Sequence, residues 1–136
     1  MDKKRVIRLI QHIDFWGIRE WAKENDLDWI VVYGSQVYGD PKDDSDLDIG
    51  FAGPIKGITV PGHLISEMEA DEHHMDEVNA GVRYGMSKGL LIYQRQEGLF
   101  KEFIEMAKKE FSVYKKKIKQ ELEEDLEEGY IIIQDV

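Results

Sequence analysis

The residues best suited to chemistry lie in one short segment, which begins with Gly34-Ser35 and ends with Asp46-Leu47-Asp48. Glycine lets a ligand approach the backbone closely, and a helical turn after it, together with the Ser35 hydroxyl, could cradle a phosphate. Asp46 and Asp48 are two residues apart, so on a strand both carboxylates project from the same face. Such a pair repels unless a cation lies between its members, and hard oxygen ligands suit Mg²⁺. A phosphate cradle beside a pair of carboxylates is the arrangement needed for metal-assisted nucleotidyl transfer.

Two predicted strands position these residues. Trp29–Tyr33 is short, β-rich and apolar on both faces, which predicts a buried strand that ends at Gly34. Residues 46–51 alternate polar and apolar side chains, which predicts a half-buried strand with both aspartates on one face. The opposite face carries the apolar side chains of Leu47, Ile49 and Phe51.

The other elements follow from hydrophobic periodicity. It predicts helices over 3–23, 63–70 and from Glu97 to Gly129, and strands over 73–79 and 90–93. This order predicts an α/β (α+β) fold, in which a small mixed sheet has helices packed on one side and a long C-terminal helix closes the chain. We expect one domain over 1–136, with a core of about 5–120, followed by an acidic helix end and an apolar tail over 121–136.

Composition narrows the class of protein. The 136 residues carry a net charge of −10, from 28 acidic and 18 basic residues, which argues against a passive nucleic-acid binder. Disulfides, thiolate zinc sites and cysteine nucleophiles are excluded because the chain has no cysteine. The longest apolar run is far shorter than the roughly 20 residues of a membrane span, and the first residues do not read as a secretory signal. We therefore expect a cytoplasmic protein without a membrane partner.

The spacing of the chemical segment resembles a known family. Gly34-Ser35, ten residues and then Asp46-Leu47-Asp48 is similar to the signature of polymerase-β-like nucleotidyltransferases, and Ser45 directly before the aspartates matches as well. The chain most resembles the minimal nucleotidyltransferases (MNT), small proteins often paired with HEPN-domain toxins, over roughly residues 5–120. The alternative interpretation of these aspartates is an acidic surface loop.

The resemblance implies a site and a reaction. A nucleoside triphosphate would bind with its phosphates at Gly34, Ser35 and Ser45, and Asp46 and Asp48 would hold Mg²⁺, with two ions expected. The family implies transfer of AMP from ATP to a hydroxyl of a partner protein, with a HEPN-type toxin as the partner and this chain as its antitoxin.

A third acid from a neighbouring strand completes the metal site in this family. The candidate segment here is His73-His74-Met75-Asp76-Glu77, and Asp76 is the preferred third ligand and catalytic carboxylate because a strand over 73–79 would put it on one face with His74. His74 and Glu77 remain alternatives for that position. The alternative interpretation of both histidines is ordinary surface residues.

Two other functions stay open. The chain could be a non-catalytic antitoxin that neutralises a basic toxin by charge and shape. It could also be a small-molecule nucleotidyltransferase of the aminoglycoside kind, with a homo-oligomer building the acceptor pocket. Extension of a nucleic acid is disfavoured because no basic track is visible beyond residues 115–119.

The end of the long helix has an unusual charge order. A basic cluster over 115–119 is followed at once by an acidic run over 121–128, and acids in the last turns of a helix do not suit its macrodipole. This segment reads either as a solvated helix end with Lys–Glu pairs or as a docking surface. The apolar seam of the helix and the tail residues 131–133 have two interpretations: they belong to the core of the fold, or they form a contact surface for a partner.

Overall fold

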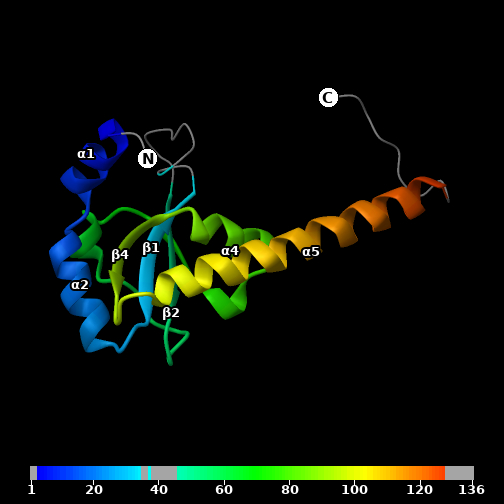
Figure 1. The fold of residues 1–136 in the computed structure, drawn as a ribbon. Coiled ribbons are helices and arrows are strands. Elements are labelled where there is room, and N and C mark those ends of the chain that lie inside the picture. Colours follow the sequence, from blue (N-terminus) through cyan, green and yellow to red (C-terminus); the bar gives the residue numbers. More distant parts are fainter. Residues whose placement is uncertain (1–2, 35–36, 38–45, 128–136) are drawn as a thin grey trace.

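A computed structural model of the chain describes residues 3–34, 37 and 46–127 (Figure 1). The predicted mixed α/β architecture with a long C-terminal helix is confirmed. In chain order the described elements are the helices α1 (Lys3–His12) and α2 (Phe15–Glu24), the strands β1 (Trp29–Tyr33) and β2 (Leu47–Ala52), the 3-10 turn η1 (Gly62–Ile65), the strand β3 (Ala70–His74), the 3-10 turn η2 (Met75–Glu77), the helix α4 (Ala80–Ser87), the strand β4 (Leu90–Gln94) and the helix α5 (Leu99–Glu127).

The four strands form one sheet in the order β3-β2-β1-β4. β1 pairs antiparallel with both β2 and β4, whereas β2 and β3 run parallel. The apolar strand β1 is therefore central, as its five buried residues require. The end of β1 and the starts of β2, β3 and β4 meet at the same edge of the sheet, because Tyr33 is level with Asp48 and Val32 with Leu90.

Helices cover both faces of the sheet, so the prediction that they pack on one side is wrong. The first face carries Ile30, Val32 and the predicted apolar face of β2, and it packs against α1, α2 and the segment around η1. The opposite face carries Trp29, Val31 and Tyr33 and is covered by α4 and α5 (Figure 1). A central strand that is apolar on both sides requires a cover on both sides.

The first predicted helix is divided into α1 and α2. The break lies at Ile13-Asp14, where the Asp14 carboxylate accepts a hydrogen bond from the Gly17 amide at 2.9 Å and caps the second helix. Ile13 itself is buried, so the apolar periodicity continues through the break and conceals it.

The segment between β2 and β4 differs most from its prediction. The helix expected over 63–70 is the single turn η1, and the strand expected over 73–79 is β3, which begins earlier and ends at His74. The helix α4 was not predicted, although Asn79 caps it by accepting a hydrogen bond from the Val82 amide at 3.0 Å. Two glycines in its eight residues weaken the helical signal.

The long helix α5 packs on the sheet only along its first half. Phe100, Phe103 and Ala107 are buried in one cluster with Trp29, and the later turns of α5 extend away from the rest of the molecule (Figure 1). The predicted helix end at Gly129 and the apolar tail lie outside the described residues. Among helices of the described segments, none has the length and apolarity needed to cross a membrane.

Candidate functional site

Gly34 and Asp48 lie against each other where β1 ends and β2 begins. Gly34 has a φ of +78°, and a Cβ built on it would lie 2.1 Å from Oδ2 of Asp48. The amide of Val37 donates to the carbonyl of Gly34 at 3.0 Å, so the chain turns immediately after β1. Only glycine combines this backbone conformation with so close a carboxylate. The structure thus brings together the glycine and an aspartate of the predicted motif.

Asp71 is the carboxylate beside Asp48 on the next strand. The two residues are paired in the parallel register of β2 and β3, so their Cα atoms are about 4.8 Å apart and their side chains share a face. Asp46 precedes β2 and is exposed, and Asp48 is half-buried. The three carboxylates therefore gather at one edge of the sheet, on the face that α4 and α5 cover.

The environment of Asp48 disfavours its negative charge. Burial, and after it the carboxylates of Asp71 and Asp46, raise the pKa of Asp48 above its usual range, and His73 partly lowers it. Asp71 and His73 alternate on β3 with Glu72 and His74, which point to the other face. The site is thus a negative patch in which the half-buried member lacks full compensation.

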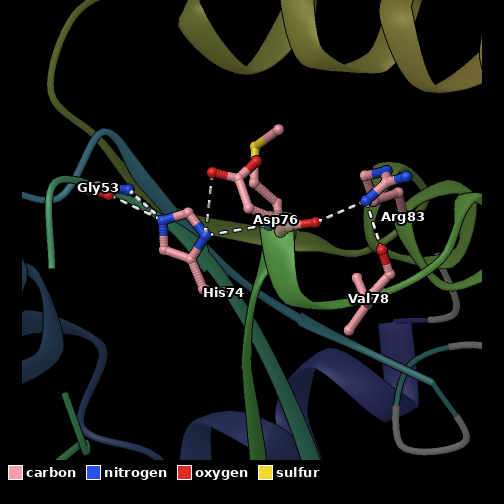
Figure 2. Close-up of polar contacts among 6 residues, drawn as sticks. Gly53, His74, Asp76, Val78 and Arg83 are labelled. Carbon is pink, nitrogen blue, oxygen red and sulfur yellow. Dashed lines mark hydrogen bonds and ion pairs between the residues drawn. The ribbon is translucent and has the colours of Figure 1, made fainter. Parts of the chain in front are cut away.

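His74 fixes the far end of β3. This buried imidazole donates from Nε2 to the Gly53 carbonyl at 2.8 Å and accepts at Nδ1 from the Asp76 amide at 3.0 Å (Figure 2). Its ring also packs edge-on against Phe51. His74 therefore joins the ends of β2 and β3, so the interpretation of this histidine as a surface residue is wrong. The exposed His73 fits that interpretation.

Arg83 of α4 holds the turn that follows β3. Its guanidinium donates to the carbonyls of Met75, at 2.9 Å, and Val78 (Figure 2). It also pairs with Glu110 of α5 at 2.7 Å. Together with His74, these bonds end β3 where it does, and they keep Asp71 in register with Asp48. Both residues support the site without belonging to it.

Asp76 is not brought to the other carboxylates. The expectation that it shares a strand face with His74 is wrong, because β3 ends at His74 and Asp76 lies in η2. His74 lies three residues beyond Asp71 on the strand, which places η2 about 10 Å further along the sheet. The Asp76 carboxylate is exposed and 3.7 Å from Nδ1 of His74. Glu77 lies in the same turn.

Asp71 was not among the predicted site residues, because the third strand was expected over 73–79 and in fact begins at Ala70. Little local signal marks this strand, because the four residues that follow Ala70 in it are all charged or histidine. The other predicted nucleotide-binding residues, Ser35 and Ser45, lie outside the described residues. Within those described, no three His, Cys, Asp or Glu side chains are already arranged around a common metal position.

Comparison with known proteins identifies the fold. No protein-family model matches the chain, and no curated protein matches it significantly. Among solved structures, a mutant of the toxin–antitoxin MntA-HpeT has a TM-score of 0.67 at 11% identity, covering 84% of this chain and 99% of that one. A toxin–antitoxin with AMP-PNP has a TM-score of 0.64 at 12% identity, with the same two coverages.

A third similar structure is a Shewanella oneidensis complex. It is described as a tri-AMPylated HEPN toxin with an MNT antitoxin, and its TM-score is 0.62 at 11% identity, covering 83% of this chain and 96% of that one. Identities this low establish similarity of fold, and the coverage shows that the similarity extends over nearly the whole of each neighbour. The chain has the fold of the MNT-type nucleotidyltransferases.

Proposed function

We propose that this chain is a nucleotidyltransferase that transfers AMP from ATP to a hydroxyl of a HEPN-type partner and thereby acts as its antitoxin. The observation that carries the proposal is the contact of Gly34 with Asp48, with Asp71 in register on the other side of Asp48. This contact joins a turn suited to phosphate with carboxylates suited to a metal ion.

The residues present fit Mg²⁺. Carboxylate oxygens are its preferred protein ligands, and Mg²⁺ usually takes one or two carboxylates and completes its shell with substrate phosphates and water. A preformed set of three ligands is therefore not required. We propose that Asp46 and Asp48 hold the ions and that Asp71 takes the third position, in place of Asp76. Mg²⁺ held by these carboxylates would supply positive charge against the negative charge that develops during transfer.

The chain's own residues have distinct tasks in this proposal. Gly34 leaves room for phosphate oxygens to reach the backbone, and Ser35 and Ser45 would donate hydrogen bonds to them. Asp71 would orient the acceptor hydroxyl and take its proton. The hydroxyl oxygen then forms a bond to the α-phosphorus, and the bond from that phosphorus to the β-phosphate oxygen breaks, which releases pyrophosphate.

The partner and the nucleotide are proposed from the neighbours. One neighbour is a complex of an MNT antitoxin with an AMPylated HEPN toxin, and another contains AMP-PNP. AMP is the group that an in-line attack on the α-phosphorus of ATP would transfer, so the neighbours and the site suggest the same reaction.

The position of the label tests the reaction. The purified chain, its HEPN partner and Mg²⁺ are incubated with ATP labelled at either the α- or the γ-phosphate. We expect label on the partner from α-labelled ATP alone. Asp48→Asn should reduce the transfer by about a hundredfold or more. The matched control is Asp26→Asn, which changes an exposed aspartate at the opposite end of β2, near Gly53, and should leave the transfer unchanged.

Other outcomes would assign a different function. Label from γ-labelled ATP would mean phosphate transfer and contradict the proposed reaction. If the unlabelled partner is silenced equally by the wild type and by Asp48→Asn, the chain is a non-catalytic antitoxin. Label on an added aminoglycoside, with none on protein, would favour the small-molecule alternative.

A further inference from the structure

Within the described part of the chain, the second half of α5 has little packing against its own domain. Phe111 stacks on Tyr84 of α4 with ring centroids 4.2 Å apart, and Tyr114 lies near Gly81, also on α4. After Tyr114 the helix continues to Glu127 and projects away from the sheet (Figure 1). Helices gain most of their stability in proteins from packing of an apolar face, so this projecting segment, residues 115–127, lacks its usual stabilisation.

The projecting segment nevertheless carries an apolar row. Ile118, Leu122 and Leu126 follow Tyr114 at a spacing of four residues and are 36%, 46% and 42% exposed. Together with Phe111 they line a shallow groove of about 430 Å³, which Lys115, Lys119 and Glu123 flank. Residues four apart form a ridge on a helix surface, which is the feature that packs into the groove of a second helix.

The charges of the projecting segment are separated along its length. The lysines stand before Gln120, at positions 115, 116, 117 and 119, and the acids stand after it, at positions 121, 123, 124, 125 and 127. Acids at the C-terminal end oppose the helix macrodipole, and a lysine before a glutamate at a spacing of four is the weaker orientation. Lys119 and Glu123 form such a pair at 4.0 Å. The helix alone therefore gains little from its charges.

We propose that a second copy of this chain covers the apolar row, with the two projecting helices antiparallel and the two-fold axis near Gln120. Residues at equal distances from Gln120 are complementary in this arrangement. It places Ile118 level with Leu122 and Tyr114 level with Leu126, and it sets the basic block 115–119 of each copy level with the acidic block 121–125 of the other. A parallel pair would instead put lysines beside lysines.

The antiparallel arrangement also matches the dimensions of the segment. With the axis at Gln120, Glu127 of one copy is level with Val113 of the other, next to Tyr114, which lies near Gly81 of α4. The overlap of 113–127 is about 22 Å long at 1.5 Å per residue. The lysines of each copy then lie beside the acidic C-terminal turns of its partner, where cations are favoured. An isologous contact of this kind closes as a dimer.

The oligomeric state of the full chain tests the proposal without nucleotide, metal or HEPN partner, so its failure is separate from that of the proposed function. Analytical ultracentrifugation in the micromolar range should show a dimer. Reversing the lysines alone, as Lys115→Glu, Lys117→Glu and Lys119→Glu, should weaken dimerisation about tenfold or more, because both halves of the helix become acidic. Reversing the acids level with them, as Glu121→Lys, Glu123→Lys and Asp125→Lys, should do the same. A variant with both reversals should dimerise again.

A second set of variants tests the apolar row without changing charge. Ile118→Gln and Leu122→Gln together should give a monomer, and glutamine keeps a good helix former at both exposed positions. The matched control is Val113→Gln, which removes an apolar side chain that is 68% exposed on another face of the same helix. It should leave the dimer intact, and circular dichroism should show the helix retained in all variants. A monomeric wild type, or a dimer that survives either reversal alone, overturns the proposal.

Discussion

Replacing Gly34 with alanine probes the contact on which the candidate site depends. The backbone at Gly34 has a φ of +78°, and the added Cβ would lie 2.1 Å from Oδ2 and 3.0 Å from Cγ of Asp48. Ordinary contacts of a Cβ begin near 3.4 Å. The carboxylate must therefore move by about 1.3 Å, which is the difference between 3.4 Å and 2.1 Å, by turning about its own side-chain bonds.

The two effects of this substitution have different sizes. The left-handed backbone should lower the free energy of unfolding by about 1–2 kcal/mol, which is a small part of the stability of a domain. The displaced carboxylate should have a larger effect on activity, since a misplacement of about 1 Å in an active site can reduce a rate about a hundredfold. Gly34→Ala should thus remain folded and lose most of its transfer activity.

A second glycine separates these two effects. Gly98 has a φ of +91° but no heavy atom within 4 Å of its added Cβ, so Gly98→Ala carries the backbone strain without the contact. Chemical denaturation and the α-label transfer assay are applied to both variants. We expect similar losses of stability and a loss of transfer in Gly34→Ala alone. Equal transfer by the two variants would refute the assignment of the nucleotide site to the contact of Gly34 with Asp48.

Three further predictions concern the acids and histidines. Asp48→Asn should stabilise the free protein at neutral pH. The pKa of Asp48 is raised in the folded state, so the wild type loses stability as pH rises from the ordinary aspartate range towards that pKa. Denaturation at several pH values should therefore show that the stability advantage of the variant vanishes in acid. Asp71→Asn should lower transfer about a hundredfold and Asp76→Asn only slightly, and the reverse result would restore Asp76 as the third carboxylate. His74→Ala should lower the free energy of unfolding by about 2–4 kcal/mol, whereas His73→Ala should change it by less than about 0.5 kcal/mol.

The parts of the fold that were predicted correctly are those with a strong local pattern. β1 is apolar throughout, β2 alternates, and the seam of α5 repeats at heptad spacing, so each element could be recognised without its neighbours. Gly34 and Asp48 could be assigned to one predicted site for the same reason, because both lie at the ends of clearly patterned strands. Their actual contact depends on the antiparallel pairing of Tyr33 with Asp48.

β3 could not be placed from local pattern because tertiary contacts determine it. Four of its five residues are charged or histidine, and no apolar alternation marks it. Its inward-facing Glu72 accepts a hydrogen bond from the Val60 amide at 2.6 Å, although burial raises the pKa of that carboxyl. Its register is set by β2 and by the anchor at His74. A misplaced β3 shifted the third carboxylate from Asp71 to Asp76.

The surroundings of Asp48 explain why the binding of a cation should be coupled to the stability of the folded state. Gly34 on one side supplies no charge and Asp71 on the other supplies a repelling one, so within the described structure His73 is the group that offsets the carboxylate. Ionised Asp48 is therefore unfavourable in the folded state until a cation arrives. A ligand that binds only the folded state stabilises it in proportion to its occupancy. In the proposed site a bound metal ion would relieve the repulsion that weakens the free protein, so the carboxylates that lower its stability would also supply the affinity for the ion.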